Sequence, residues 1–219
     1  MSSDPAKERL YQAVGRVAAA LGSAGRLQIL EFVAQGERGV DALAAMTGLS
    51  VANTSKHLQA LRQAGLVNAR KAGLRVHYSL AGDDVSLLLA ALRGVAEHRA
   101  ADVEKLLQTW LAHRDELEPV PAREVLERLK KGLVTVLDVR PAEEYAAGHL
   151  PGAISVPVDR LARYLSRLPK RKEVVAYCRG PYCLMSFDAV ALLRKRGFKA
   201  KRLQDGYPEW RAAGLPVEH

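Results

Sequence analysis

The segment Glu-Leu-Glu-Pro-Val-Pro at residues 116–121 divides the chain into two parts with different apolar patterns. Two prolines, Pro119 and Pro121, lie within three residues, and a helix cannot continue through them. Before this segment, apolar residues recur at helical spacing. After it, short apolar runs alternate with helical stretches, which is typical of a mainly parallel sheet. The 219 residues therefore predict two domains, residues 1–117 and 118–219, each large enough to bury its own core.

The first part is predicted to be mainly helical and to bind DNA. A tight turn at Gly48 separates two short helices, which is the helix-turn-helix arrangement, and a basic hairpin that follows would form a wing. The expected helices span residues 5–21, 26–35, 41–46 and 51–63, and the expected strands span residues 66–71 and 75–80. Polar outward positions on the fourth helix and basic positions on the wing suit base edges and phosphates. The DNA-binding residues predicted in this way are Asn53, Thr54, Ser55, Lys56, His57, Gln59, Arg70, Lys71, Arg75 and His77.

The charge distribution agrees with this assignment only locally. The chain carries a net charge of +9, of which residues 1–118 contribute +1 and residues 119–219 contribute +8. Residues 50–82 nevertheless contain several Lys and Arg residues and no acid. Because phosphate attraction is screened over about 10 Å, this local stripe matters more than the total charge.

A long helix is predicted to begin at Asp83 and to reach Trp110, with an apolar stripe that Arg99 interrupts. So long a stripe on a small domain needs a partner. We expect it to pair with the first helix across a two-fold axis and form a homodimer. The alternative is that it packs only internally or against the second domain.

Residues 48–67, G-L-S-V-A-N-T-S-K-H-L-Q-A-L-R-Q-A-G-L-V, resemble the turn, recognition helix and exit of the ArsR/SmtB family of winged-helix repressors. The resemblance extends over roughly residues 5–115 and implies a homodimer that reads double-stranded, pseudo-palindromic operator DNA, with half-sites about one helical turn apart. Many members carry a cysteine-rich metal site in the third helix. Since the first 177 residues contain no cysteine, thiolate metal sensing in this domain is excluded. An alternative metal site would use His98 or Asp102, although exposed histidines are more often simply solvated.

The second part contains both cysteines of the chain, Cys178 and Cys183, in one loop. A strand-like run from Val174 ends at Cys178, and a helix is expected from Ser186, so Cys178 lies on a strand-to-helix turn. There the helix dipole and backbone amides favour the nucleophilic thiolate, and Arg179 adds a cation. The alternative is that Cys178 is only a small buried apolar residue.

Three segments of this part resemble the rhodanese domain over roughly residues 119–217: L-D-V-R-P-A-E-E-Y-A-A-G-H-L-P-G-A-I (137–154), Y-C-R-G (177–180) and D-G-Y-P-E-W-R-A-A-G-L-P-V (205–217). The resemblance implies that Cys178 takes up a sulfane sulfur as a persulfide, assisted by Arg179 and cradled by loop amides. It assigns anion binding to the loop positions Gly180, Tyr182 and Leu184, and mainly scaffold roles to Asp138, Arg140 and His149.

The loop departs from the family pattern at Cys183, where rhodaneses commonly carry a second cation or a hydroxyl. A bound thiosulfate would lose a charge-assisted hydrogen bond worth about 1.5 to 3 kcal/mol. Cys183 is instead a candidate resolving thiol that forms a disulfide with Cys178, or else a buried residue of the helix start. A third possibility is reduction of arsenate or another oxyanion, since related rhodanese-fold phosphatases use a longer loop that ends in Arg. This interpretation is disfavoured, because Leu184 or Met185 lies where that Arg would fall.

These patterns predict a transcriptional regulator, and a repressor in particular, whose rhodanese domain senses reactive sulfur or another thiophile such as arsenic. The alternative is a working sulfurtransferase that also binds DNA. A sulfane sulfur donor is the expected small-molecule partner, and no cofactor or metal is implied. The chain has no run of 18 apolar residues and no basic-then-apolar leader, so we expect a soluble cytoplasmic protein without a membrane partner.

Overall fold

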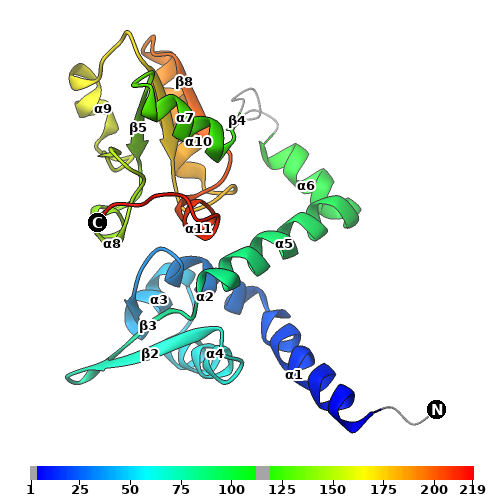
Figure 1. Cartoon of the computed structure of the whole chain (residues 1–219). Coiled ribbons are helices and arrows are strands. Elements are labelled where there is room, and N and C mark those ends of the chain that lie inside the picture. The colour runs from blue at the N-terminus through cyan, green and yellow to red at the C-terminus, as the bar shows by residue number, and fades with distance from the viewer. Residues whose placement is uncertain (1–3, 112–118) are drawn as a thin grey trace. The chain divides into compact units, whose positions relative to one another are not determined.

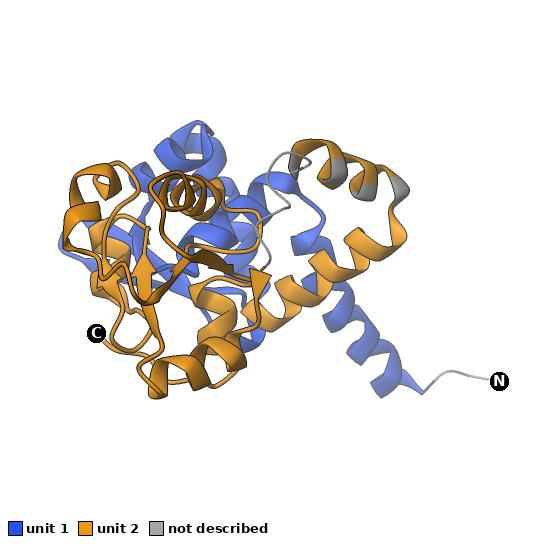
Figure 2. Ribbon diagram, turned by 90° about the horizontal axis from the view of Figure 1, so that it is seen from above, with its two compact units in different colours: residues 1–85 blue, residues 86–219 orange. Residues whose placement is uncertain are grey.

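The computed structural model describes residues 4–111 and 119–219. The chain forms two compact units, Met1–Val85 and Ser86–His219, which Figure 2 distinguishes by colour. The domain boundary predicted between residues 117 and 118 lies outside the described residues and stays a prediction. The helix that begins at Asp83 continues into the second unit and makes side-chain contacts there.

The first unit has the predicted winged helix-turn-helix architecture. Ser50 caps the recognition helix by accepting a hydrogen bond from the Asn53 amide at 3.2 Å, and Gly48 makes the preceding turn at a φ of 71°. The three strands form an antiparallel sheet in the order β1-β3-β2. The elements are α1 (Pro5–Leu21), α2 (Ala24–Val33), β1 (Arg38–Gly39), α3 (Val40–Thr47), α4 (Val51–Gln63), β2 (Val67–Ala72) and β3 (Arg75–Leu80). Its core contains the fully buried side chains of Ile29, Leu30, Leu43, Leu58 and Leu61.

The prediction of one long helix from Asp83 to Trp110 is wrong. The structure has two helices, α5 (Asp83–Arg99) and α6 (Ala101–Leu111), which meet at Ala100 next to the interruption of the stripe at Arg99. Apolar side chains remain exposed on α5 at Leu88, Leu92 and Val95, which share one face of that helix. On α1, Leu10, Tyr11 and Val14 are also exposed.

The second unit contains the predicted α/β domain (Figure 1), and its five-stranded sheet has the order β4-β8-β7-β5-β6. All its strand pairs are parallel, which confirms the mainly parallel sheet. The strands are β4 (Pro119–Val120), β5 (Val134–Asp138), β6 (Ile154–Ser155), β7 (Glu173–Tyr177) and β8 (Ala200–Leu203). The helices are α7 (Ala122–Lys130), α8 (Ala142–Ala147), α9 (Leu161–Tyr164), α10 (Leu184–Lys195) and α11 (Tyr207–Ala212), with the short 3-10 helix η1 (Leu165–Arg167) after α9.

Strand β7 is buried on both faces because helices pack against each face of the sheet. Val174, Ala176 and Cys178 belong to a cluster with residues of α9 and α10. Val175 and Tyr177 belong to a second cluster with residues of α7 and α11. The alternation of a strand thus directs Cys178 and its neighbour Tyr177 into opposite layers.

Among the described residues, no helix combines the length and apolar character needed to cross a membrane.

Candidate functional site

The two cysteines lie in one loop at the carboxyl end of β7. Cys178 follows the last residue of the strand and is 1% exposed, whereas Cys183 is half-buried and immediately precedes α10. The structure joins them by a disulfide across a Cα separation of 6.2 Å. The helix begins at Leu184 rather than at Ser186 as predicted, so Leu184 is a helical residue and not part of the loop.

Close contact with the segment before α11 shapes this loop. The Tyr207 amide donates to the Cys178 carbonyl at 3.2 Å, and the Cys183 amide donates to the Gly180 carbonyl at 3.1 Å. Gly206 lies against the loop backbone so tightly that a Cβ there would be 2.4 Å from atoms of Arg179 and Gly180. Sequence reasoning did not identify Gly206 as a site residue, although it lies in the D-G-Y-P-E-W motif.

Arg179 is held by a carboxylate that the sequence analysis missed. Its Nε donates to both oxygens of Glu144 at 3.0 Å, and its Nη2 donates at 2.7 Å. Glu144 lies on α8 and its side chain is fully buried, while that of Arg179 is 18% exposed. The positive charge expected beside Cys178 is therefore engaged by an acid. The sequence marks Glu144 only as a Glu in a helical stretch, and such a residue is ordinarily solvated, so the sequence did not point to a partner of Arg179.

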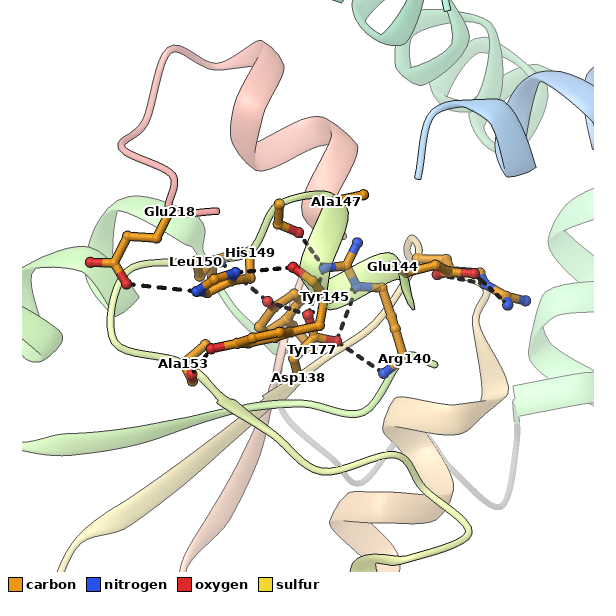
Figure 3. A network of polar contacts seen from close by, with 12 residues as sticks. Asp138, Arg140, Glu144, Tyr145, Ala147, His149, Leu150, Ala153, Tyr177 and Glu218 are labelled. Atoms are coloured by element: carbon orange, nitrogen blue, oxygen red, sulfur yellow. Dashed lines mark hydrogen bonds and ion pairs between the residues drawn. The ribbon is translucent and has the colours of Figure 1, made fainter. Parts of the chain in front are cut away.

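Asp138 and Arg140 form a fully buried ion pair at the end of β5, with Nη2 to Oδ2 at 2.6 Å (Figure 3). The Arg140 guanidinium also donates to the Gly148 carbonyl at 2.8 Å. The Tyr177 hydroxyl donates to Asp138 at 2.5 Å and accepts from the Leu150 amide at 3.2 Å. Burial, followed by the charge of Asp138, raises the pKa of Tyr177, so its hydroxyl stays protonated. This network fixes the residue directly before Cys178.

His149 contacts the scaffold. Its Nδ1 lies 3.0 Å from the Tyr145 carbonyl, and the two rings stack with centroids 3.7 Å apart. Its backbone pairs with Glu218 through two hydrogen bonds of 2.9 Å. The segment containing His149 is thereby joined to the C-terminal residues of the domain.

Tyr182, predicted as an anion-binding loop residue, directs its hydroxyl toward α5, where it donates to Glu97. Its ring lies 6.5 Å from that of Trp110 on α6, centroid to centroid. Burial and this hydrogen bond raise the pKa of Tyr182.

The recognition helix α4 presents Asn53, Lys56 and Gln59 to solvent, and it leaves Ser55 and His57 half-buried. Thr54 does not face outward: it is fully buried and its hydroxyl donates to the Ser50 carbonyl at 3.0 Å. Its predicted outward position is wrong because Thr54 shares the inner face with Leu58, one helical turn further on.

On the wing, Lys71 and Arg75 are exposed and His77 is half-buried. Arg70 is also exposed but pairs with Glu37, with contacts of 2.9 and 2.5 Å. This hydrogen bond lowers the pKa of Glu37 below its usual value. Residues 50–82 contain no acid, but Glu37, which lies just before β1, therefore neutralises one of their positive charges.

In the parts of the chain that the structure describes, no group of three or more His, Cys, Asp or Glu side chains is arranged to hold a metal ion. The His98 Nδ1 lies 2.6 Å from the Gly94 carbonyl, within its own helix.

Comparisons with known proteins agree with both units. Residues 23–69 match the model of the bacterial regulatory protein, arsR family, and residues 121–213 match the rhodanese-like domain. The chain is 47% identical to the HTH-type transcriptional regulator Rv0324 of Mycobacterium tuberculosis over 97% of this chain and 93% of the relative.

Two further relatives are similar to single parts of the chain. A sulfurtransferase of Allochromatium vinosum is 33% identical over 38% of this chain and 78% of its own length. A winged helix-turn-helix fragment from Mycobacterium bovis, solved by NMR and described as homodimeric, is 42% identical with a TM-score of 0.42, covering 47% of this chain and 94% of the fragment. The full-length similarity and the two matched models show that the chain belongs to the ArsR family of helix-turn-helix transcriptional regulators and carries a rhodanese-like domain.

Proposed function

We propose that this regulator is a dimeric repressor whose rhodanese domain senses reactive sulfur, or another thiophile, through Cys178. The observation that carries the proposal is the disulfide between Cys178 and Cys183 inside one loop. A sulfurtransferase needs a single nucleophilic thiol, whereas a second thiol within bonding distance converts sulfur uptake into a stable change of the protein.

The chemistry has two steps. The Cys178 thiolate first attacks a polysulfide, takes up one sulfur atom as a persulfide and releases the shortened polysulfide as the leaving group. The Cys183 thiolate then attacks Sγ of Cys178, and hydrosulfide leaves with the transferred sulfur. Overall, the two thiols lose two electrons and the sulfane sulfur gains them. The proton balance is completed by solvent.

The DNA-binding half of the proposal rests on α4 and the wing. Asn53, Lys56 and Gln59 are exposed on one helix, and Lys71 and Arg75 are exposed on the adjacent hairpin. These residue types bind base edges and phosphates. The apolar side chains exposed on α1 and α5 support a homodimer, since a second copy would cover them.

The test measures intact mass and DNA affinity in the same sample, before and after treatment with inorganic polysulfide. The DNA is an operator selected in vitro from random double-stranded fragments. In wild-type protein reduced beforehand we expect loss of two hydrogen atoms together with a change in affinity. Cys183→Ser should stop at the gain of one sulfur atom, and Cys178→Ser should remain unmodified at that position. Modification without any change in affinity would refute the sensor.

A second function, sulfur transfer, is favoured by the position of Cys178 directly after a parallel strand, at the edge of the sheet where ligands bind in α/β folds. Its test is turnover of a polysulfide with cyanide as acceptor. Sustained turnover that Cys183→Ser increases would favour the enzyme, because the variant lacks the competing disulfide.

A further inference from the structure

Tyr182 of the cysteine loop contacts helix α5. Its hydroxyl donates to Glu97 of α5, and its ring lies 6.5 Å from the Trp110 ring of α6, centroid to centroid, at an interplanar angle of 56°. Helix α5 begins at Asp83 in the first unit and continues through the second. The contact therefore joins the disulfide loop to the helix that emerges from the winged helix-turn-helix unit.

A second contact anchors the same face of α5. Arg93, which precedes Glu97 by four residues, forms an ion pair with Glu209. Glu209 in turn accepts a hydrogen bond from the Gly206 amide at 3.0 Å. Helix α5 thus contacts one residue inside the loop and one residue of the segment that supports the loop from outside.

These two contacts differ in their relation to the disulfide. Tyr182 lies within the ring that the Cys178–Cys183 bond closes, directly before Cys183, so its backbone position depends on that bond. Glu209 lies outside the ring and is held by α11. Opening the disulfide releases the first contact from its covalent constraint and leaves the second in place.

We propose that Tyr182 transmits the redox state of the Cys178–Cys183 pair to helix α5 through its hydrogen bond to Glu97. The inference rests on the proposed function, because it supplies the connection between the cysteine pair and the DNA-binding unit. Reduction by a dithiol returns the Cys178–Cys183 pair to two thiols. One molecule of dithiol gives two electrons and two protons to the disulfide, which yields two cysteine thiols and the oxidised, cyclic dithiol.

The test compares operator affinity of oxidised and dithiothreitol-reduced full-length protein in matched variants. Tyr182→Phe removes only the hydroxyl and keeps the ring beside Trp110. Tyr164→Phe is the control, because Tyr164 lies on α9 outside the loop, with its ring 5.6 Å from the Arg167 guanidinium. We expect the two redox states of the wild type and of Tyr164→Phe to differ about tenfold in affinity, a typical allosteric coupling, and those of Tyr182→Phe by less than about twofold.

Two variants of the acceptor separate hydrogen bonding from packing. Glu97→Gln keeps an acceptor oxygen and should retain the redox difference, whereas Glu97→Leu should lose it as Tyr182→Phe does. A wild-type redox difference that persists in both Tyr182→Phe and Glu97→Leu overturns the inference and leaves the sensor intact. If wild type and Tyr164→Phe show no redox difference, the sensor fails and the inference fails with it.

Trp110 gives a readout that needs no DNA. Of the two tryptophans, Trp210 is fully buried in the sheet domain, whereas Trp110 is exposed beside Tyr182. We expect reduction to shift the fluorescence of wild type and not that of Trp110→Phe. A shift of the same size in Trp110→Phe would come from Trp210 and would show that Tyr182 does not move relative to Trp110, which would overturn the premise that opening the disulfide releases Tyr182.

Discussion

Replacing Gly206 with alanine tests how the loop is built. The φ of Gly206 is −110°, which alanine adopts freely, so any penalty comes from contact rather than from backbone strain. The new Cβ would be 2.4 Å from backbone atoms of Arg179 and Gly180, and backbone cannot rotate away as a side chain can. Overpacking costs about 1 to 3 kcal/mol, and losing the hydrogen bond from Tyr207 to Cys178 adds about 0.5 to 1.5 kcal/mol.

We therefore expect Gly206→Ala to lower the free energy of unfolding of the rhodanese domain by about 1.5 to 4.5 kcal/mol. The assay is urea unfolding followed by fluorescence of Trp210, which is fully buried in that domain. Gly94→Ala is the matched control: it lies in α5 with open space around its Cβ, so it should be neutral or stabilising by up to about 1 kcal/mol. A loss below about 1 kcal/mol in Gly206→Ala would refute the close-approach reasoning.

Three further predictions concern single polar contacts. Glu37→Gln frees Arg70 from its ion pair, so operator affinity should rise and the salt dependence of binding should steepen by about one phosphate contact, measured by titration at several salt concentrations. Burial raises the pKa of Asp205 in the folded protein, so its ionised carboxylate destabilises the fold at pH values above the unfolded pKa of about 4. Asp205→Asn should therefore raise the midpoint of unfolding at pH 7, and this gain should vanish as the pH falls through the unfolded pKa. Tyr177→Phe leaves buried Asp138 without one of its donors and should cost about 1.5 to 3 kcal/mol in urea unfolding, whereas an unchanged midpoint would show that the network tolerates the loss.

The longer helices and strands were predictable because the apolar residues of each recur with the period of a helix or a strand. The expected helix at residues 5–21 and the recognition helix at 51–63 coincide with α1 and α4. The second strand of the hairpin was also correctly bounded. Two-residue strands such as β4 and β6 have no period, and they form only because the neighbouring strands β8 and β5 offer main-chain partners. Pro119 and Val120, taken as part of the boundary segment, are for this reason the edge strand of the sheet.

The sequence by itself determined that Cys178 lies on a strand-to-helix turn with Cys183 close behind it, because strand, break and helix are local signals within a few residues. Only the tertiary structure decided what surrounds the pair. Arg179 binds Glu144, 35 residues away, and Tyr182 binds Glu97, 85 residues away. Such partners depend on which elements pack together, and packing is a property of the whole chain that no local pattern encodes. The sequence therefore predicted the thiol chemistry of the loop, whereas only the tertiary structure revealed the contact between the loop and helix α5.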